Sequence, residues 1–221
     1  MKNLVLFFAL SLALAACNNA PKGEKVETKD AVGATAAAAA TSVSADNYAV
    51  DIAKSTLNWE GTEPGDEGHN GTIALKSGSF VVENNVLKGG SFDIDMNSIA
   101  VADLTGDKKA KLEKHLKDGD FFETDKFPAG KFTITGVEAV ANDPSVSHRI
   151  SGDLMLKDKT KNISFPVKMS IAEGKLTAES KPFTFNRTEW NIKYHSTVVG
   201  TIKNKLINDN IGMTIKIEAA K

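Results

Sequence analysis

The sequence has few cysteines and almost no imbalance of charge. Cys17 is the only cysteine among 221 residues, and 27 Lys and Arg residues stand against 28 Asp and Glu residues. A single thiol excludes a framework of internal disulfides. A formal net charge of −1 provides no overall field that would attract nucleic acid or an anionic membrane surface. We therefore expect no nucleic-acid partner, and we expect specificity to come from shape or from a local site.

Sequence motifs for catalysis and metal binding are also missing. The chain contains no GxSxG, no HExxH and no glycine-rich phosphate loop. Its four histidines, His69, His115, His148 and His195, lie in different segments without the HxH or HxxxH spacing of a metal site. We predict that the protein is not an enzyme, that it has no metal site and that it needs no cofactor.

The N-terminus carries an apolar run from Leu4 to Ala16, which follows Lys2 and ends at Cys17. A positive start, an apolar middle and small residues at the end are typical of a secretory signal. Residues 14–17, Leu-Ala-Ala-Cys, resemble the bacterial lipobox, in which the cysteine thiol carries the lipid. The run of about 13 residues is shorter than the roughly 20 that span a bilayer. A transmembrane helix and an uncleaved ordinary signal are the alternatives.

The predicted organisation is a lipoprotein signal peptide at residues 1–16, then an acylated Cys17 with a flexible linker up to residue 47, then one domain at 48–221. Residues 18–47 are mostly small or polar and show no periodic apolar face. Such a coil would hold the domain roughly 30 Å from its anchor. The expected location is outside the cytoplasm, on the periplasmic face of the outer membrane, because Asn18 follows the cysteine.

The chain after the linker alternates apolar and polar residues with a period of two. Residues 163–171 place Ile, Phe, Val, Met and Ile at every second position, and residues 92–96, 150–156 and 211–217 show similar patterns. This period predicts half-buried antiparallel strands. Short turns between the strands predict hairpins, and one helix is expected at residues 108–117.

About eight strands with short connections form either a two-sheet sandwich or a barrel, and closure removes the free edges. The predicted fold is therefore all-β, an eight-stranded antiparallel barrel with one short helix. Eight strands enclose an interior that side chains fill or that holds one ligand. The side chains predicted to line an apolar ligand tunnel are Phe80, Val82, Phe92, Ile94, Phe132, Leu154, Leu156, Phe165, Val167, Met169, Phe183 and Phe185. The alternative, in which they pack only on one another, stays open.

Several short motifs occur together in the domain. HL, DFF, FP and KF follow one another between residues 115 and 132, with GSFDIDMNS at 90–98 and ISFPV at 163–167. Together they resemble the YceI-like family over residues 48–221. The resemblance implies a lipocalin-like barrel outside the cytoplasm that binds a polyisoprenoid lipid in an elongated internal pocket. It brings no set of catalytic residues.

The aromatic residues after the helix would then lie at one mouth of the barrel. The expected mouth residues are His115, Phe121, Phe122, Phe127, Arg187, Trp190, Lys193 and Tyr194. Arg187, Lys193 and Tyr194 would meet a polar head such as a quinone ring or a diphosphate. In the alternative interpretation Arg187 ties down its loop, Trp190 fills the barrel end and His115 belongs to the core. Asn191 stands where the family usually has glycine, and Asn tolerates a positive φ.

The predicted function is that of an extracytoplasmic, lipid-anchored binding protein. It would carry or store a polyisoprenoid, an isoprenoid quinone or a similar amphiphilic lipid in an internal apolar tunnel. Its expected partners are that lipid and, through the N-terminal acyl anchor, a membrane; a homodimer stays open. The alternative is a structural or interaction lipoprotein whose barrel core is filled by its own side chains and binds no ligand.

Overall fold

The computed structural model describes residues 20–33, 45–65, 68–200 and 206–221. The predicted signal peptide, the predicted acylation site Cys17 and the central part of the predicted linker lie outside these residues. The strands are β1 (Glu24–Lys25), β2 (Lys29–Asp30), β3 (Asp46–Val50), β4 (Thr56–Gly61), β5 (His69–Glu83), β6 (Val86–Val101), β7 (Ala129–Ala139), β8 (His148–Leu156), β9 (Lys159–Ala172), β10 (Lys175–Ser180), β11 (Phe183–Asn186) and β12 (Asn210–Ala220). The helices are α1 (Gly106–Lys117) and the short 3-10 helices η1 (Arg187–Trp190) and η2 (Thr197–Val199).

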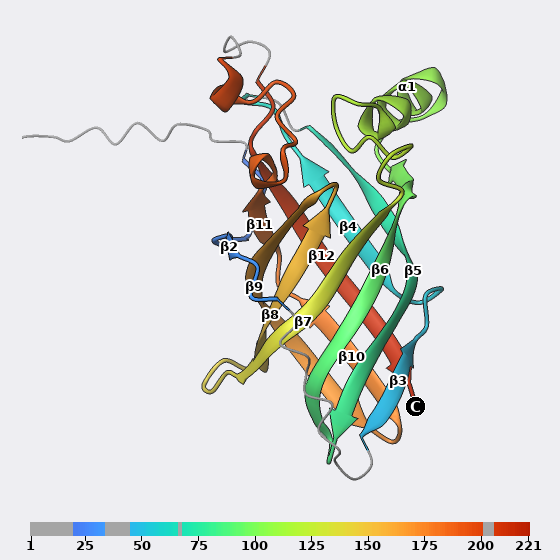
Figure 1. Ribbon diagram of the computed structural model, residues 1–221, viewed down its shortest axis with the longest axis vertical. Helices are drawn as coiled ribbons and strands as arrows, with labels where there is room; N and C mark the ends of the chain where they lie inside the picture. The colour runs from blue at the N-terminus through green and yellow to red at the C-terminus, as the bar shows by residue number, and fades with distance from the viewer. Residues whose placement is uncertain (1–19, 34–44, 66–67, 201–205) are drawn as a thin grey trace, which may run out of the picture.

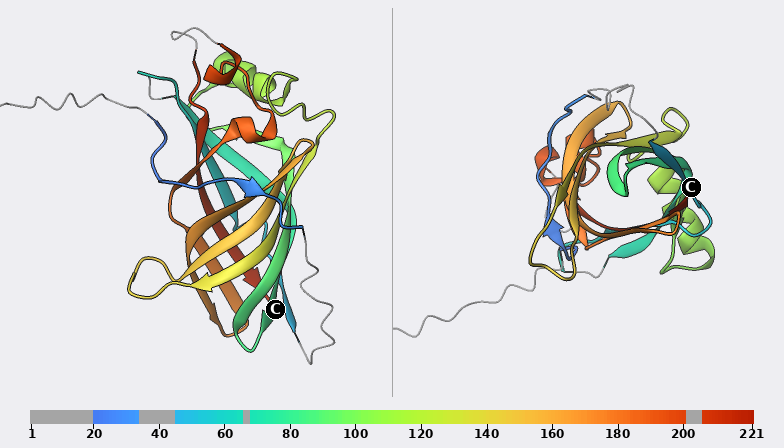
Figure 2. Two further views of the ribbon diagram at one scale, coloured as in Figure 1. Left: turned by 60° about the vertical axis from the view of Figure 1, so that its left-hand side comes forward. Right: turned by 90° about the horizontal axis from the view of Figure 1, so that it is seen from below.

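A ring of 8 antiparallel strands forms the body of the protein (Figure 1). Around the ring the order is β4, β5, β6, β7, β8, β9, β10 and β12, and β12 pairs with β4 to close it. β3 extends the wall beside β5 and β12, while β11 continues the line of β10 along β12. Seen along its axis the ring is closed (Figure 2). The predicted all-β, eight-stranded lipocalin-like barrel is confirmed.

Strand β6 illustrates why this sequence closes around an apolar interior. Phe92, Ile94 and Met96 are buried, whereas Asp93 and Asp95 between them remain partly exposed. Successive side chains of a strand point to opposite faces, so the apolar half of β6 faces inward. The outer half stays polar, and the Ser77 hydroxyl donates a 2.7 Å hydrogen bond to Asp93 there.

Helix α1 lies at one end of the barrel together with η1 and η2 (Figures 1 and 2); we call this end the mouth. The helix begins slightly before the predicted residues 108–117, and Asp118 caps its C-terminus through its backbone N–H. The Phe121 N–H donates to the Asp118 carbonyl and the Phe122 N–H to the Leu116 carbonyl. This tight turn directs the chain back toward the barrel. Of the helices described, none is both long and apolar enough to cross a bilayer.

Residues 20–33, which we call the N-terminal strap, differ from the flexible linker that their composition predicts. β1 pairs in parallel with β11, and β2 pairs antiparallel with β9. Pro21 and Val26 are buried against the barrel wall. The backbone N–H and C=O groups of the strap pair with the free edges of β9 and β11. This pairing does not depend on the type of side chain, so composition does not reveal it.

Candidate functional site

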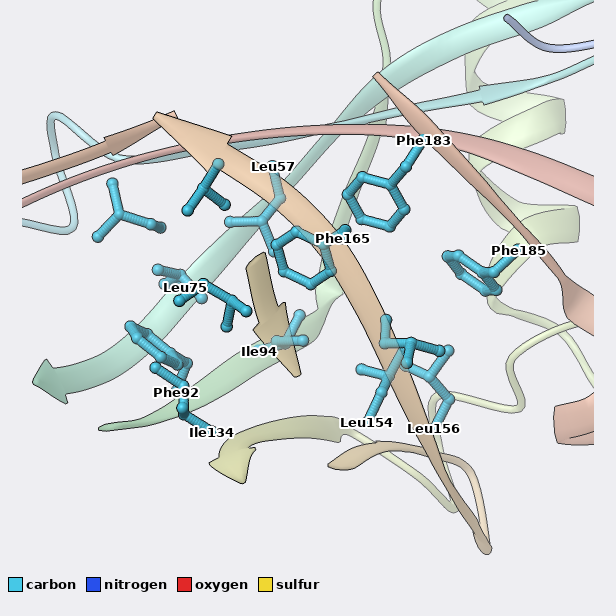
Figure 3. Packing of buried hydrophobic residues seen from close by; sticks show 14 of the residues in the cluster. Leu57, Leu75, Phe92, Ile94, Ile134, Leu154, Leu156, Phe165, Phe183 and Phe185 are labelled. Atoms are coloured by element: carbon cyan, nitrogen blue, oxygen red, sulfur yellow. The ribbon is translucent and has the colours of Figure 1, made fainter. Parts of the chain in front are cut away.

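An inner cavity lies inside the ring and has a volume of about 130 Å³. Of the described residues around it, Ser180 alone has a hydroxyl, amide or charged side chain. Figure 3 shows aliphatic and aromatic side chains from several strands converging in the interior. A site with so few polar groups offers water almost no hydrogen bonds, and it suits an apolar ligand. The lining residues are Leu57, Ile73, Leu75, Phe80, Leu87, Phe92, Ile94, Met96, Phe122, Phe132, Ile134, Ile150, Leu154, Leu156, Ile163, Phe165, Val167, Met169, Ala178, Ser180, Phe183, Phe185, Met213, Ile215 and Ile217.

All predicted tunnel residues except Val82 line this cavity. Val82 is 1% exposed, but it lies at the end of β5 beside the β5–β6 hairpin, where the register shifts between Val81 and Val82. Such a shift re-aims the side chains that follow it. The lining also includes Leu57 of β4 and Met213 of β12, which the tunnel prediction omitted although both lie on alternating strands.

A row of phenylalanines crosses the interior. Adjacent ring centroids are 5.0 Å apart for Phe80 and Phe92, 6.3 Å for Phe92 and Phe132, and 5.8 Å for Phe132 and Phe165. Gly152 on β8 makes room for this row, because a Cβ there would lie 2.2 Å from the Phe132 ring. The rings meet edge-on or tilted, an arrangement that aromatic pairs favour, and together they line the cavity with apolar surface.

An outer cavity of about 330 Å³ lies at the mouth, between the ends of β4 and β5, helix α1 and the loop after η1. Its lining is mixed, with aromatic, histidine and arginine side chains beside aliphatic ones. Phe122 and Ile73 line both cavities, so Phe122 lies between the apolar interior and the more polar mouth. The lining residues are Trp59, Gly61, Thr62, Glu63, Gly68, His69, Ile73, Ile99, Leu112, His115, Leu116, Phe121, Phe122, Arg187, Tyr194, His195, Ile207 and Ile211.

Three predicted mouth residues form one aromatic cluster. The His115 ring lies edge-on to Phe121 at 5.1 Å and to Tyr194 at 4.7 Å, and Phe121 and Tyr194 are 5.3 Å apart. Tyr194 also stacks on His195 at 3.9 Å. The cluster joins α1 to the loop after η1, and its four rings form one wall of the outer cavity.

Arg187 connects two loops at the mouth and is 2% exposed. Its Nη1 donates to the Ile192 carbonyl (2.8 Å), its Nη2 to that of Ile207 (3.1 Å) and its Nε to that of Asn208 (3.2 Å). The Asp209 carboxylate lies 3.4 Å from Nη2. Burial lowers the pKa of Arg187, and Asp209 opposes that shift. Every guanidinium nitrogen thus has a protein acceptor, which agrees with the interpretation that Arg187 ties down its loop.

Trp190 fills the barrel end beside Arg187. Its side chain is 0% exposed, its Nε1 donates to the Leu154 carbonyl (3.0 Å), and its ring meets Phe185 edge-on at 5.1 Å. Asn191 follows with φ of 60° in the left-handed region, as expected for an Asn that replaces glycine. The η1 turn therefore keeps a sharp ending that holds Trp190 in place.

Three predicted mouth residues line neither cavity: Trp190, which is enclosed at the barrel end, Lys193 and Phe127. Lys193 is exposed and lies on the outer surface near Lys159 and Lys161. Phe127 is half-buried, with the Lys157 Nζ 6.0 Å from its ring centroid. Lys193 points to solvent because an unpaired ammonium would lose hydration inside the barrel, and Phe127 packs beside the turn that precedes β7.

The outer cavity also contains residues that the sequence prediction missed. Trp59 lines it, and its Nε1 is buried with no hydrogen-bond partner among the described residues. The His69 Nδ1 lies 2.8 Å from the Asp103 carboxylate. Burial raises the pKa of Asp103, but hydrogen bonds from His69 and from the Asn70 N–H outweigh this effect and leave the pKa below its ordinary value. The only sequence signal for Trp59 is an aromatic residue two positions after Leu57, and it does not indicate that this side chain reaches the mouth.

An eight-stranded barrel with an apolar interior and a mixed aromatic and polar mouth defines a class of protein built to enclose a ligand-sized apolar cavity. Residues 48–219 match the YceI-like domain. The chain therefore belongs to the YceI-like family.

Individual relatives are similar over most of the domain. A UPF0312 protein of Shewanella denitrificans is 28% identical over 136 residues, which cover 61% of this chain and 67% of that protein. The crystal structure of Burkholderia cenocepacia BcnA has a TM-score of 0.58 at 16% identity, covering 77% of this chain and 99% of BcnA. A polyisoprenoid binding domain from Saccharophagus degradans, implicated in plant cell wall breakdown, has a TM-score of 0.54 at 12% identity, covering 78% and 97%. These structures share the fold.

Proposed function

We propose that this protein carries or stores an isoprenoid lipid, with the prenyl chain in the inner cavity and the polar head in the outer cavity. The observation that carries the proposal is the pair of adjoining cavities, one almost purely apolar and one mixed, which share Phe122. An amphiphile with an apolar tail and a compact polar head matches this division. The Saccharophagus degradans neighbour, described as a polyisoprenoid binding domain, supports the same ligand class.

The sizes of the two cavities indicate how the ligand would fit. The inner cavity of about 130 Å³ is near the roughly 150 Å³ of a dry engineered cavity that binds benzene. It therefore holds only a short part of a prenyl chain unless side chains move. Displacing Phe122 would join it to the outer cavity of about 330 Å³. Burial of about ten methylenes would contribute roughly 8 kcal/mol before ordering costs.

The head group that best fits the outer cavity is an uncharged hydrogen-bond acceptor, such as a quinone ring. No described residue accepts a hydrogen bond from the buried Trp59 Nε1, and a ligand oxygen would satisfy it. Arg187 already donates to protein carbonyls, and Lys193 faces the outer surface. A diphosphate would therefore find few free cationic donors at the mouth.

The proposed setting is a membrane surface outside the cytoplasm, reached through an acyl anchor on Cys17. The lipobox-like sequence that ends at Cys17 supports this setting. If so, Cys17→Ser should release folded protein into the soluble fraction. Retention of the variant in a salt-washed membrane pellet would contradict the anchor without bearing on the cavity.

A fluorescence titration tests the ligand proposal, because Trp59 lines the outer cavity whereas Trp190, the last residue of η1, is fully buried and lines neither cavity. A short-chain isoprenoid quinone should quench the fluorescence of the Cys17→Ser protein with saturation near one equivalent, and a prenyl alcohol should reverse the quenching. Trp59→Phe should lose most of the quenching. A tail-less quinone serves as the control. No saturable binding of any prenyl compound would favour the alternative of a self-filled barrel.

A further inference from the structure

The barrel wall contains a seam between β9 and β11. The β9–β10 ladder ends where Ser180 pairs with Val167, and the Lys181 N–H then donates to the Pro166 carbonyl (3.0 Å). Beyond that point the two strands have different partners. β11 pairs with β12 on the side away from β9, and residues 159–165 of β9 pair with β8. Within the described part of the chain, β9 and β11 share no ladder of their own.

Two prolines mark the seam in the sequence. Pro166 lies within β9, and Pro182 immediately precedes β11. Proline has no N–H to donate, and within sheets it therefore occurs at edges. Two residues before Pro166, the Ser164 carbonyl accepts a hydrogen bond from the Arg149 side chain (3.2 Å). Both strands thus present edges at the seam.

The N-terminal strap covers the seam from outside. In Figure 2 it runs along the outer surface of the ring, with β1 paired to β11 and β2 paired to β9. Gly23 permits the close approach, because its φ is +138° and a Cβ there would lie 2.6 Å from the Pro182 carbonyl carbon. Val26 is 5% exposed and belongs to the core cluster.

Polar side-chain contacts fasten the strap to β8 and β9 on one side of the seam, and backbone hydrogen bonds fasten it to β11 on the other. The Glu24 carboxylate accepts hydrogen bonds of 2.7 and 3.1 Å from the Arg149 Nη2. Asp30 lies 3.0 Å from the Lys161 Nζ. Exposed ion pairs of this kind are weak, and each strap ladder involves only two residues of the strap. The strap is therefore held less firmly than the long strands of the ring.

The inner side of the seam is the inner cavity itself. Phe165 of β9 and Phe183 of β11 stack across it with centroids 4.5 Å apart and planes 4° apart (Figure 3). Ile163 and Phe185, their neighbours along the same strands, also line the cavity. Side chains and the strap alone thus separate the cavity from solvent here.

The mouth is the alternative route, and aromatic side chains obstruct it as well. Trp190 is 0% exposed, and Phe121 is 7% exposed inside the cluster with His115 and Tyr194. Elsewhere around the ring, each pair of neighbouring strands shares a hydrogen-bonded ladder. Between ring strands a long chain would break a ladder, and from the mouth it would have to displace Phe122. At the seam it breaks no ladder of the ring, but it must lift the strap and separate the Phe165 and Phe183 rings.

We propose that the N-terminal strap is a movable wall of the binding site, and that the seam beneath it is a side portal for the apolar chain of the ligand. The portal rests on the proposed function, since it presupposes a ligand chain in the inner cavity. The strap precedes residues 48–219, so this wall is supplied from outside the matched domain. A prenyl or similar hydrocarbon chain passes sideways through the seam while its head remains in the outer cavity.

A reversible lock tests the portal directly. Asp30 and Lys161 are register partners on β2 and β9, a placement that suits a disulfide. We expect Asp30→Cys with Lys161→Cys, in the full chain carrying Cys17→Ser, to slow release of a fluorescent prenyl probe about tenfold or more when oxidised. Reduction should restore the rate. The matched control is Glu179→Cys with Lys216→Cys, partners on β10 and β12 away from the strap, which should leave release unchanged in both redox states.

Deletion of residues 20–33 provides a second, independent measurement and should accelerate probe release. Release rates that are the same for the locked, reduced and strap-deleted proteins, in chains that still bind the probe with saturation, would overturn the portal and leave the proposed function standing. Failure of the unlocked Cys17→Ser protein to bind the probe at all would instead overturn the proposed function. The two failures are therefore distinguishable.

Discussion

Arg187 and Lys193 carry the same charge close together in the sequence, yet their surroundings are opposite. Arg187 is buried and donates to three backbone carbonyls, whereas Lys193 is exposed on the outer surface. Residue type alone suggested that both would meet a ligand head. Only the fold separates a structural cation from a solvated one, because the carbonyls of Ile207 and Asn208 reach Arg187 from a distant loop.

Arg187→Met should lower the free energy of unfolding by about 2 to 4 kcal/mol, because it leaves buried carbonyls and the Asp209 carboxylate without their donor. Lys193→Met, the matched control, should change it by less than about 0.5 kcal/mol. Denaturant unfolding measures both. A stable Arg187→Met protein that loses affinity only for ligands with a polar head would show instead that Arg187 binds the head.

Phe122→Ala should join the inner and outer cavities, since Phe122 lines both. We expect a loss of about 1 to 3 kcal/mol in stability, less than for a fully buried phenylalanine because Phe122 is only half-buried. Binding of longer prenyl alcohols should improve relative to short ones. Phe127→Ala is the control, because Phe127 lines neither cavity. The same chain-length preference in both variants would contradict a dividing role for Phe122.

The inward or outward direction of a side chain could be predicted where its strand alternates regularly. Phe92, Ile94 and Phe165 could be assigned to the interior because strict alternation fixes their face. Val82 was also assigned to the cavity lining but does not line it, because a register shift precedes it in β5. Trp59 and His69 reach the mouth only through closure of the ring, which brings β4 and β5 beside the loop after η1, and no local pattern encodes that approach.

Among the elements, the ring strands and α1 were predictable, whereas the strap was not. Period-two alternation and hairpin turns specify long strands, and a helix was expected where α1 lies. β1 and β2 are two residues each and lack any apolar periodicity, because their pairing depends on backbone groups at the edges of β9 and β11. The strap therefore has the composition of a linker although it pairs with strands of the barrel wall.

Hydrogen exchange should distinguish these elements. The Glu24 amide donates to the carbonyl of Pro182, just before β11, and the Val26 amide donates to that of Thr184 in β11. Because these ladders are short, the two amides should exchange through local opening at a lower free energy than the amides of β5 and β6. Peptides covering residues 20–33 should therefore label early and those covering 70–100 late. Equal protection for the two groups would contradict a movable strap.

At the scale of the whole molecule, one architectural feature accounts for the cavities and for the side portal. A ring of eight strands encloses an interior that its side chains fill except for a cavity of about 130 Å³. The aromatic mouth closes one end of this interior, and the break between β10 and β11 leaves a seam that the strap covers. The fold class followed from sequence pattern alone, while the division into two cavities depends on where Phe122 lies after the chain turns back from α1.

The most direct test of ligand binding is mass analysis of lipids extracted from the natively purified full-length protein. We expect an isoprenoid compound in near-equimolar amount, most of which should disappear from a Phe165→Asp variant that remains folded by circular dichroism, since a carboxylate in the inner cavity would lose its hydration. Phe127→Asp, outside both cavities, should retain it. A folded wild-type protein that yields no isoprenoid and takes up none on incubation would contradict the account.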